Sequence, residues 1–125
     1  MTQAAIDQIA KVCHEANRAY CETLGDTSQP SWESAPEWQK DSVRNGVKFH
    51  LSQLATGNVP IPADSHNKWM EQKRAEGWKY GPVKDPSKKE HPCFVEYNQL
   101  PLDQRRKDYI FGAICKAFAS LADWE

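Results

Sequence analysis

The sequence has almost no net charge and no long apolar run, and each absence argues against a class of function. Its 16 Lys and Arg residues face 17 Asp and Glu residues, and the formal net charge of -1 disfavours a dedicated polyanion-binding protein. No apolar run approaches the roughly 20 residues that a helix needs to cross a bilayer. The 125 residues suffice for one domain with a modest core. We therefore expect a single domain over residues 1–125, with no membrane segment.

The sequence also lacks the short motifs of common enzyme and cofactor-binding families. It contains no glycine-rich phosphate loop, no H-E-x-x-H and no G-x-S-x-G. Cys93 follows His91 by two positions, which would put a thiol and a base on one side of an extended chain. No third group that could orient the base accompanies them. We therefore expect neither catalytic residues nor a cofactor.

The cysteines show neither a disulfide pattern nor a good zinc pattern. There is no C-x-x-C pair, and no secretory leader pattern precedes them, which favours reduced thiols in a cytoplasmic protein. Cys13 and His14 are adjacent, so they would point to different faces of a helix and would be poor partners for His91 and Cys93 in a zinc site. We expect no bound metal. The four cysteines are Cys13, Cys21, Cys93 and Cys115.

Apolar residues spaced by three and four positions predict three longer helices and one short helix. The first covers about residues 2–24, and Gly25 can end it in the left-handed conformation. The second runs from a capping box at Ser34 to a stop before Gly57. The short helix covers about residues 64–76.

The fourth predicted helix begins near Pro101 and has the most regular apolar stripe. Its apolar positions follow the pattern i, i+3, i+4, i+7, i+8 and i+11, which is typical of a helix with one buried face. The residues of this stripe are Ile110, Ala113, Ile114, Ala117, Phe118 and Leu121.

Residues beside the stripes carry further expectations. His14 falls off the stripe of the first helix, so we expect it on a solvated face. His50 flanks the stripe of the second helix, and a lone histidine there is more often a structural group than an acid or base. Trp32, in the proline-flanked link, either packs on a neighbouring core or forms the wall of a pocket.

Two short segments between the last two helices predict a small antiparallel ribbon. Trp78, Lys79 and Tyr80 alternate large aromatic and charged side chains, which is the period of a strand. After Pro92, residues 93–97 are again strand-like. The loop between these segments, of about ten residues, is too long for a tight hairpin, and such loops often carry function. The expected fold class is therefore α+β and mostly helical.

The stretch over residues 64–106 has a dense pattern of aromatic, glycine and proline residues. It reads H-x-x-W from His66, G-W-K-Y-G-P-V-K-D from Gly77 and H-P-C-F-V-E-Y from His91. In this register it resembles the RyR domain, the repeat named after the ryanodine receptor calcium-release channels and also found as single copies in bacterial and phage proteins. The resemblance is strongest over this stretch and extends more loosely over residues 20–118.

The resemblance implies a noncatalytic module. Repeats in the channels occur as tandem pairs around an approximate twofold axis, so a single copy is expected to reproduce the pair as a homodimer. The association of prokaryotic members with signalling and phage-conflict systems further implies sensing of nucleotide-derived signals.

The residues of the same stretch make a separate case for a small anionic ligand. Bases stack on aromatic side chains with about 1 to 3 kcal/mol each, and phosphates bind Lys and Arg. Residues 68–107 carry ten basic and six acidic side chains. We therefore expect an adenine or ADP-ribose-type nucleotide. The candidate residues are Trp69 and Trp78 for stacking, Tyr80 and His91 for polar orientation, and Lys84, Lys88, Lys89 and Arg105 for the anion.

Each candidate has a structural alternative. Trp78 and Tyr80 share one strand face and could belong to the core. Lys88 and Lys89 could be solvated loop charges, and His91 a turn residue. The alternative function is a protein-interaction module with no small-molecule ligand, in which the aromatics serve the fold or a dimer interface. Double-stranded nucleic acid is disfavoured because the basic stretch is short and lies between acidic helices.

Overall fold

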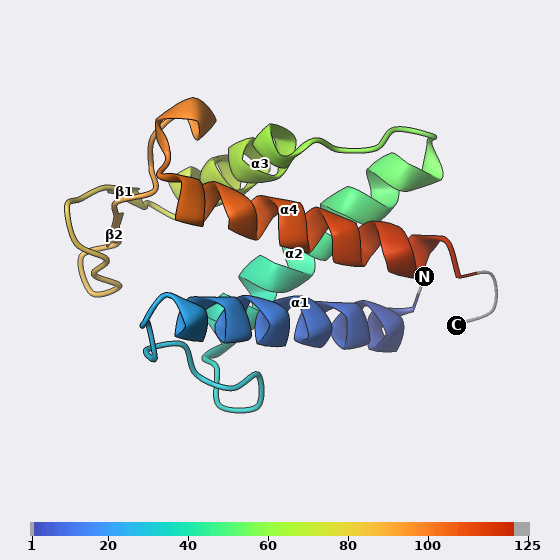
Figure 1. Ribbon diagram of the computed structural model, residues 1–125, viewed down its shortest axis with the longest axis horizontal. Helices are drawn as coiled ribbons and strands as arrows, with labels where there is room; N and C mark the ends of the chain where they lie inside the picture. Colours follow the sequence, from blue (N-terminus) through green and yellow to red (C-terminus); the bar gives the residue numbers. More distant parts are fainter. Residues whose placement is uncertain (1, 122–125) are drawn as a thin grey trace.

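The computed structural model describes residues 2–121 as four α-helices and a two-stranded ribbon (Figure 1). The helices are α1 (Gln3–Thr23), α2 (Glu37–Ala55), α3 (Pro62–Ala75) and α4 (Leu102–Ala119). The ribbon pairs β1 (Lys79–Tyr80) with β2 (Glu90–His91), and the short 3-10 helix η1 (Tyr97–Gln99) precedes α4. The mostly helical prediction, with three longer helices and one shorter helix, is confirmed. Within residues 2–121, no helix has both the length and the apolarity needed to cross a membrane.

The hydrophobic core lies where α1, α2 and α4 meet. Figure 1 shows α1 and α4 side by side in opposite directions, with α2 packed against both and the ribbon at one end of the molecule. Four of the seven buried core residues come from α1, which reflects its regular apolar spacing. The core residues are Ile6, Ile9, Ala10, Cys13, Trp32, Val47 and Cys115.

The starts of α2 and α3 differ from those predicted. Ser34 does not cap α2, because its own backbone N–H donates to Ser31 and the helix begins at Glu37. Helix α3 begins at Pro62, whose fixed φ suits a first helical position. The Asp64 carboxylate accepts the N–H of Ile61 at 3.0 Å, so Asp64 lies in the first turn and does not precede the helix.

The predicted solvated position of His14 is wrong. His14 is buried, its Nε2–H donates to the carbonyl of Pro30 at 2.7 Å, and its ring lies 5.8 Å from that of Trp32. The Glu15 carboxylate also accepts the N–H of Trp32 at 3.0 Å. The link after α1 therefore folds back over the helix and covers a face that the helix alone would expose. Of the two interpretations for Trp32, the structure supports packing on the core.

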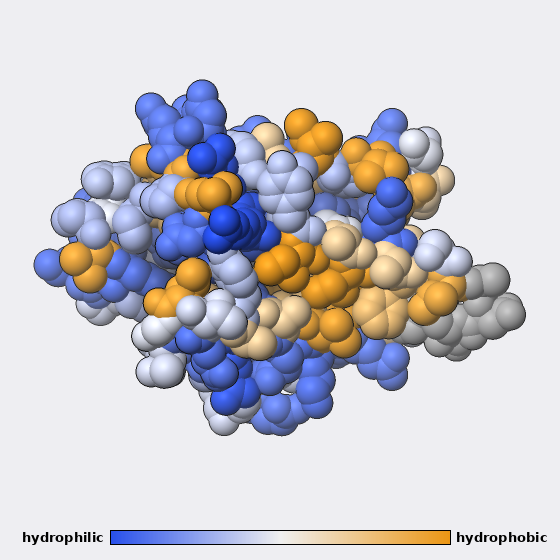
Figure 2. Space-filling model, in the orientation of Figure 1, coloured by the Kyte–Doolittle hydropathy of each residue, from blue (hydrophilic) through white to orange (hydrophobic). Residues whose placement is uncertain are grey.

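The apolar stripe of α4 is only partly buried. Ala113, Ala117 and Leu121 are exposed, whereas Cys115, which is off the predicted stripe, is fully buried. The reason is that α4 packs against α1, α2 and α3, so its inner face is set by three neighbours and not by its own periodicity. Figure 2 shows the resulting strip of apolar surface along α4.

The ribbon is parallel, so the prediction of an antiparallel ribbon is wrong. Lys79 pairs with Glu90, and Tyr80 pairs with His91. Inside the connecting loop, Asp85 and Glu90 already form an antiparallel bridge through two backbone hydrogen bonds of 2.9 and 3.1 Å. The chain thus reverses before it reaches β2 and then runs in the same direction as β1.

The predicted strand over residues 93–97 does not form. The N–H of Cys93 donates to Nδ1 of His91 at 3.0 Å, and the chain then turns into η1. The alternation in this segment has another cause, which is packing against α3. The Phe94 ring lies 5.2 Å from that of Trp69, and the Tyr97 ring lies against His66.

The cysteines are free thiols, as predicted. Cys13, Cys21 and Cys115 are buried, and Cys93 is half-buried.

Candidate functional site

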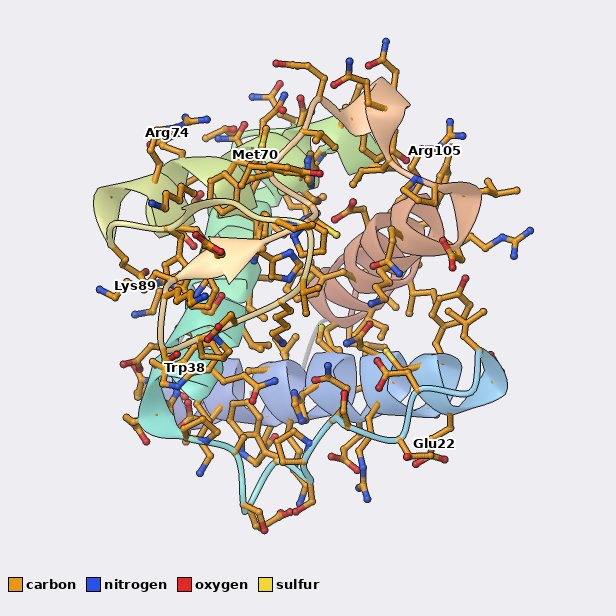
Figure 3. All side chains as sticks on the ribbon, turned by 90° about the vertical axis from the view of Figure 1, so that its left-hand side faces the viewer. Glu22, Trp38, Met70, Arg74, Lys89 and Arg105 are labelled. Carbon is orange, nitrogen blue, oxygen red and sulfur yellow. The ribbon has the colours of Figure 1, made fainter. Side chains whose placement is uncertain are left out.

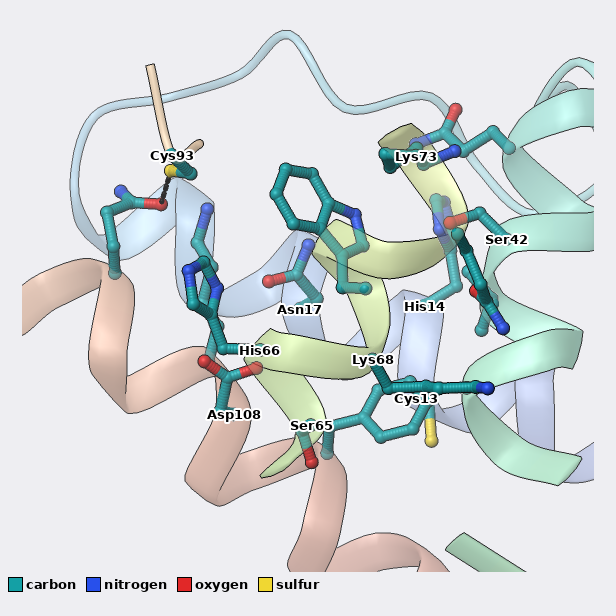
Figure 4. Close-up of a pocket in the computed structure, with 18 of the residues that line it drawn as sticks. Cys13, His14, Asn17, Ser42, Ser65, His66, Lys68, Lys73, Cys93 and Asp108 are labelled. Atoms are coloured by element: carbon teal, nitrogen blue, oxygen red, sulfur yellow. Dashed lines mark hydrogen bonds between the residues drawn. The ribbon is translucent and has the colours of Figure 1, made fainter. Parts of the chain in front are cut away.

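A cavity of about 270 Å³ lies between the four helices and the ribbon (Figure 4). Its volume is close to the lower end of the range for small-molecule sites, roughly 300 to 1,000 Å³. Every helix contributes to the wall: Asn17 comes from α1, Gly46 from α2, His66 from α3 and Gln104 from α4. Because these elements are distant in sequence, tertiary packing alone creates the cavity.

Aromatic rings form much of the wall. The rings of Trp38 and Trp78 lie 5.8 Å apart at a tilted angle, and that of Trp69 lies 5.0 Å from His91 in an edge-on contact. His66 is stacked on Trp69 at 5.8 Å. His66 and Trp69 share a face of α3 because residues three apart on a helix are neighbours. The cavity therefore offers flat apolar surfaces on which a ring could stack.

Hydrogen bonds fix the protons of two histidines in the wall. His66 lies 2.7 Å through Nε2 from the carbonyl of Val95, which only accepts, so this nitrogen is the donor. Nδ1 of His91 accepts the backbone N–H of Cys93, so the proton of this ring is on Nε2. Burial, followed by the charges of Lys84 and other lysines, lowers the pKa of His91 to about 4. His91 is thus a neutral ring with its donor nitrogen unused by the described chain.

The most unusual cation in the wall is Lys73. The residue is 3% exposed, and its Nζ lies 5.2 Å from the ring centroid of Trp38 and 5.7 Å from that of Trp78. Glu76 lies 3.5 Å away, but within residues 2–121 the Nζ has no hydrogen-bond partner. Burial lowers the pKa of Lys73, and the charge of Glu76 opposes this shift.

A second basic region lies at the ribbon and the start of α4. Lys84 lines the cavity although much of the residue is exposed, and burial followed by the charge of Lys107 lowers its pKa. Burial raises the pKa of Asp108, which also lines the cavity, to about 7, and Lys107 opposes that shift. The carboxylate of Asp26, which does not line the cavity, attracts both lysines electrostatically. Asp26 is thus a counter-charge for Lys84 and Lys107, whereas the counter-charge of Lys73 is Glu76.

The structure brings half of the predicted site residues together. Trp69, Trp78, Lys84 and His91 line the cavity.

The other four predicted residues do not line the cavity. Tyr80 is 57% exposed, and Lys88 is an exposed loop residue. Lys89 donates from Nζ to the carbonyl of Glu76 at 2.7 Å, at the end of α3. Figure 3, which views the ribbon end, shows Lys89 and Arg105 at opposite edges of the molecule.

The predicted site left out four charged residues of the wall, which are Lys68, Lys73, Lys107 and Asp108. Lys73 had a usable signal, because it follows His66 and Trp69 at positions i, i+3 and i+7 of one helical face. Lys107 and Asp108 had no such local signal. Figure 4 shows Lys73 and Asp108 on different sides of the cavity, carried by α3 and α4.

Comparison with known families identifies the family of the chain. The family model of the RyR domain matches residues 50–117, which is more than half of the chain. The chain therefore belongs to the RyR domain family, as the resemblance in the sequence implied. The matched segment holds α3, the ribbon and nearly all of α4, whereas α1, with its contribution to the core and the cavity, lies outside it.

Proposed function

We propose that this protein is a noncatalytic module that binds a small anionic ligand derived from a nucleotide, with the cavity as its site. The observation that carries the proposal is the buried ammonium of Lys73 in a cavity walled by tryptophans: it has an ion pair with Glu76 at 3.5 Å but no hydrogen-bond partner among residues 2–121. A desolvated donor without a partner is costly, and a ligand acceptor would remove that cost. Adenine and ADP-ribose-type nucleotides combine a ring with an anion and are the first candidates.

The contacts of Cys93 and His91, the thiol and the base that lie close together in the sequence, support a noncatalytic role. Burial raises the pKa of Cys93, which keeps it a thiol and a weak nucleophile. Its Sγ lies 3.8 Å from Oε1 of Gln104, and the only lone pair of His91 is taken by a backbone N–H. His91 therefore has no free acceptor with which to deprotonate the thiol.

The direct test is to look for the ligand. Native mass spectrometry of the purified protein is expected to show a copurified small molecule, or calorimetric titration with adenine, cyclic and ADP-ribose nucleotides is expected to show saturable binding. A bare protein that ignores the whole panel would contradict the proposal.

Replacing Trp69 with alanine is expected to weaken binding by about 5- to 150-fold. This range corresponds to the loss of one stacking contact of about 1 to 3 kcal/mol. Calorimetry with the panel nucleotide that binds best is the measurement, and circular dichroism checks that the variant folds. The matched control is Tyr80→Ala, because Tyr80 is an exposed aromatic outside the cavity. Equal losses in both variants would remove Trp69 from the site.

The apolar strip on α4 favours a second candidate function, a module that pairs with another copy of itself. Ala113, Ala117 and Leu121 expose apolar surface along one helix, and Tyr109 beside them is 62% exposed. A homodimer would cover this surface. Light scattering is expected to give the mass of two chains at micromolar concentrations. A mass of one chain that does not change with concentration would contradict the dimer.

A further inference from the structure

The surroundings of Lys73 define an anion position more narrowly than the cavity as a whole. Its ammonium lies within cation–π distance of two tryptophan rings, one from α2 and one at the start of the ribbon. These rings exclude water from its flanks but accept no strong hydrogen bond. Glu76, the carboxylate paired with it, belongs to the C-terminal end of α3, is partly exposed and lies 3.5 Å from the ammonium, at the outer limit of a hydrogen bond.

The other basic residues of the wall lie near different carboxylates. Lys84 and Lys107 repel each other, and both attract the carboxylate of Asp26. The charge of Lys107 also favours the ionised form of Asp108, against the larger effect of burial. An anion at that end of the cavity would compete with carboxylates that are already present. An anion at Lys73 would supply a hydrogen-bond partner that the described chain does not.

The neutral ring of His91 adds a donor near this position. The charges of Lys84, Lys107 and Lys73 all help to lower the pKa of His91 after burial, so the ring lies near both basic regions. Its Nε2–H carries no charge, which allows it to bind an oxyanion without adding to the repulsion among the lysines. Trp69, in edge contact with His91 and stacked on His66, also lines the cavity beside this donor.

We propose that Lys73 binds the phosphate of the ligand at the end of the cavity where Trp38 and Trp78 form the wall. This inference rests on the proposed function and states which cation of the cavity holds the anion. It predicts that the part of the affinity due to phosphate depends on Lys73 and not on the more exposed lysines.

The experiment compares adenosine, adenosine 5′-monophosphate and ADP-ribose by calorimetry on the wild type and three lysine variants. Lys73→Met keeps a long unbranched side chain against the tryptophans and removes only the charge and its donors. Lys84→Met makes the same change at the other basic end of the cavity. Lys79→Met is the control outside the cavity, on an exposed ribbon residue 3.9 Å from Glu90.

In the wild type, at least one phosphate-bearing probe is expected to bind at least tenfold more tightly than adenosine. Lys73→Met is expected to lower the affinity for that probe at least tenfold and to leave adenosine within threefold. Lys79→Met should change neither. Lys73→Gln, which keeps a polar end, is the second variant if the first does not fold, and the same loss is expected.

Two outcomes would overturn the inference and leave the proposed function in place. One is a loss of the phosphate contribution in Lys84→Met but not in Lys73→Met, which would put the anion at the ribbon end. The other is an equal loss of adenosine and of the phosphate-bearing probe in Lys73→Met, which would make Lys73 a structural residue. Failure of the wild type to bind any of the three probes or the wider nucleotide panel would overturn both proposals.

Discussion

Replacing Ile9 with alanine is expected to lower the free energy of unfolding by about 3 kcal/mol. Ile9 is fully buried in the core formed by α1, α2 and α4, and truncation of such a side chain loses its burial and leaves a cavity. Urea denaturation followed by circular dichroism measures the change. Val12→Ala is the matched control, because Val12 lies on the same helix but is 41% exposed, and it should change the free energy by about 0.5 kcal/mol or less.

This result would show whether α1 is an integral part of the fold. The match to the RyR domain begins at residue 50, so α1 lies outside it. Yet Ile9 shares the core with Val47 and Cys115, and Asn17 of the same helix lines the cavity. Unchanged unfolding of Ile9→Ala would mean that α1 unfolds separately from the matched segment.

The second large effect is a gain of stability in Asp108→Asn that depends on pH. Burial raises the pKa of Asp108 to about 7, whereas the unfolded chain loses this proton near pH 4. Ionisation in the unfolded state therefore lowers the stability of the wild type as pH rises from about 4 to about 7, and the loss is complete above the folded pKa. Asparagine cannot ionise and escapes this loss.

The expected advantage of Asp108→Asn is on the order of 2 kcal/mol at pH 8 and close to zero at pH 4. Thermal denaturation of both proteins at pH 4, 6 and 8 measures it. Other carboxyls, such as those of Asp26 and Asp85, have lowered pKa values and act in the opposite direction, so only the difference between the two proteins is informative. Glu96→Gln, on an exposed residue, is the control. The same advantage at pH 4 and pH 8 would show that ionisation is not its cause.

The helices could be predicted from the sequence because their apolar spacing is local information. What failed was set by contacts between distant segments. His14 is buried because the link after α1 folds over it, and nothing within the helix indicates this. The direction of β2 depends on the bridge between Asp85 and Glu90, which reverses the chain inside a loop that only appeared long and polar.

The residues of the cavity also divide into those indicated by local sequence and those placed by contacts between distant segments. Trp69 and Trp78 were expected in the site from their residue types, and both line it. Lys88 and Lys89 were expected there because they are close to His91 in sequence, but the early reversal of the loop keeps them outside. Lys107 and Asp108 enter the wall only because α4 packs across α3, a contact with no signal in either helix.

The loop over residues 85–90 is closed by its own hydrogen bonds. Besides the bridge between its ends, Oδ1 of Asp85 accepts the N–H and the hydroxyl of Ser87 at 3.0 and 2.6 Å. None of residues 85–90 lines the cavity, whereas Lys84 before the loop and His91 after it do. The exposed tip is thus an attachment point near the cavity but separate from it. Ser87 is exposed and does not line the cavity, so a fluorophore on Ser87→Cys would label the ribbon end of the protein without replacing a residue of the wall.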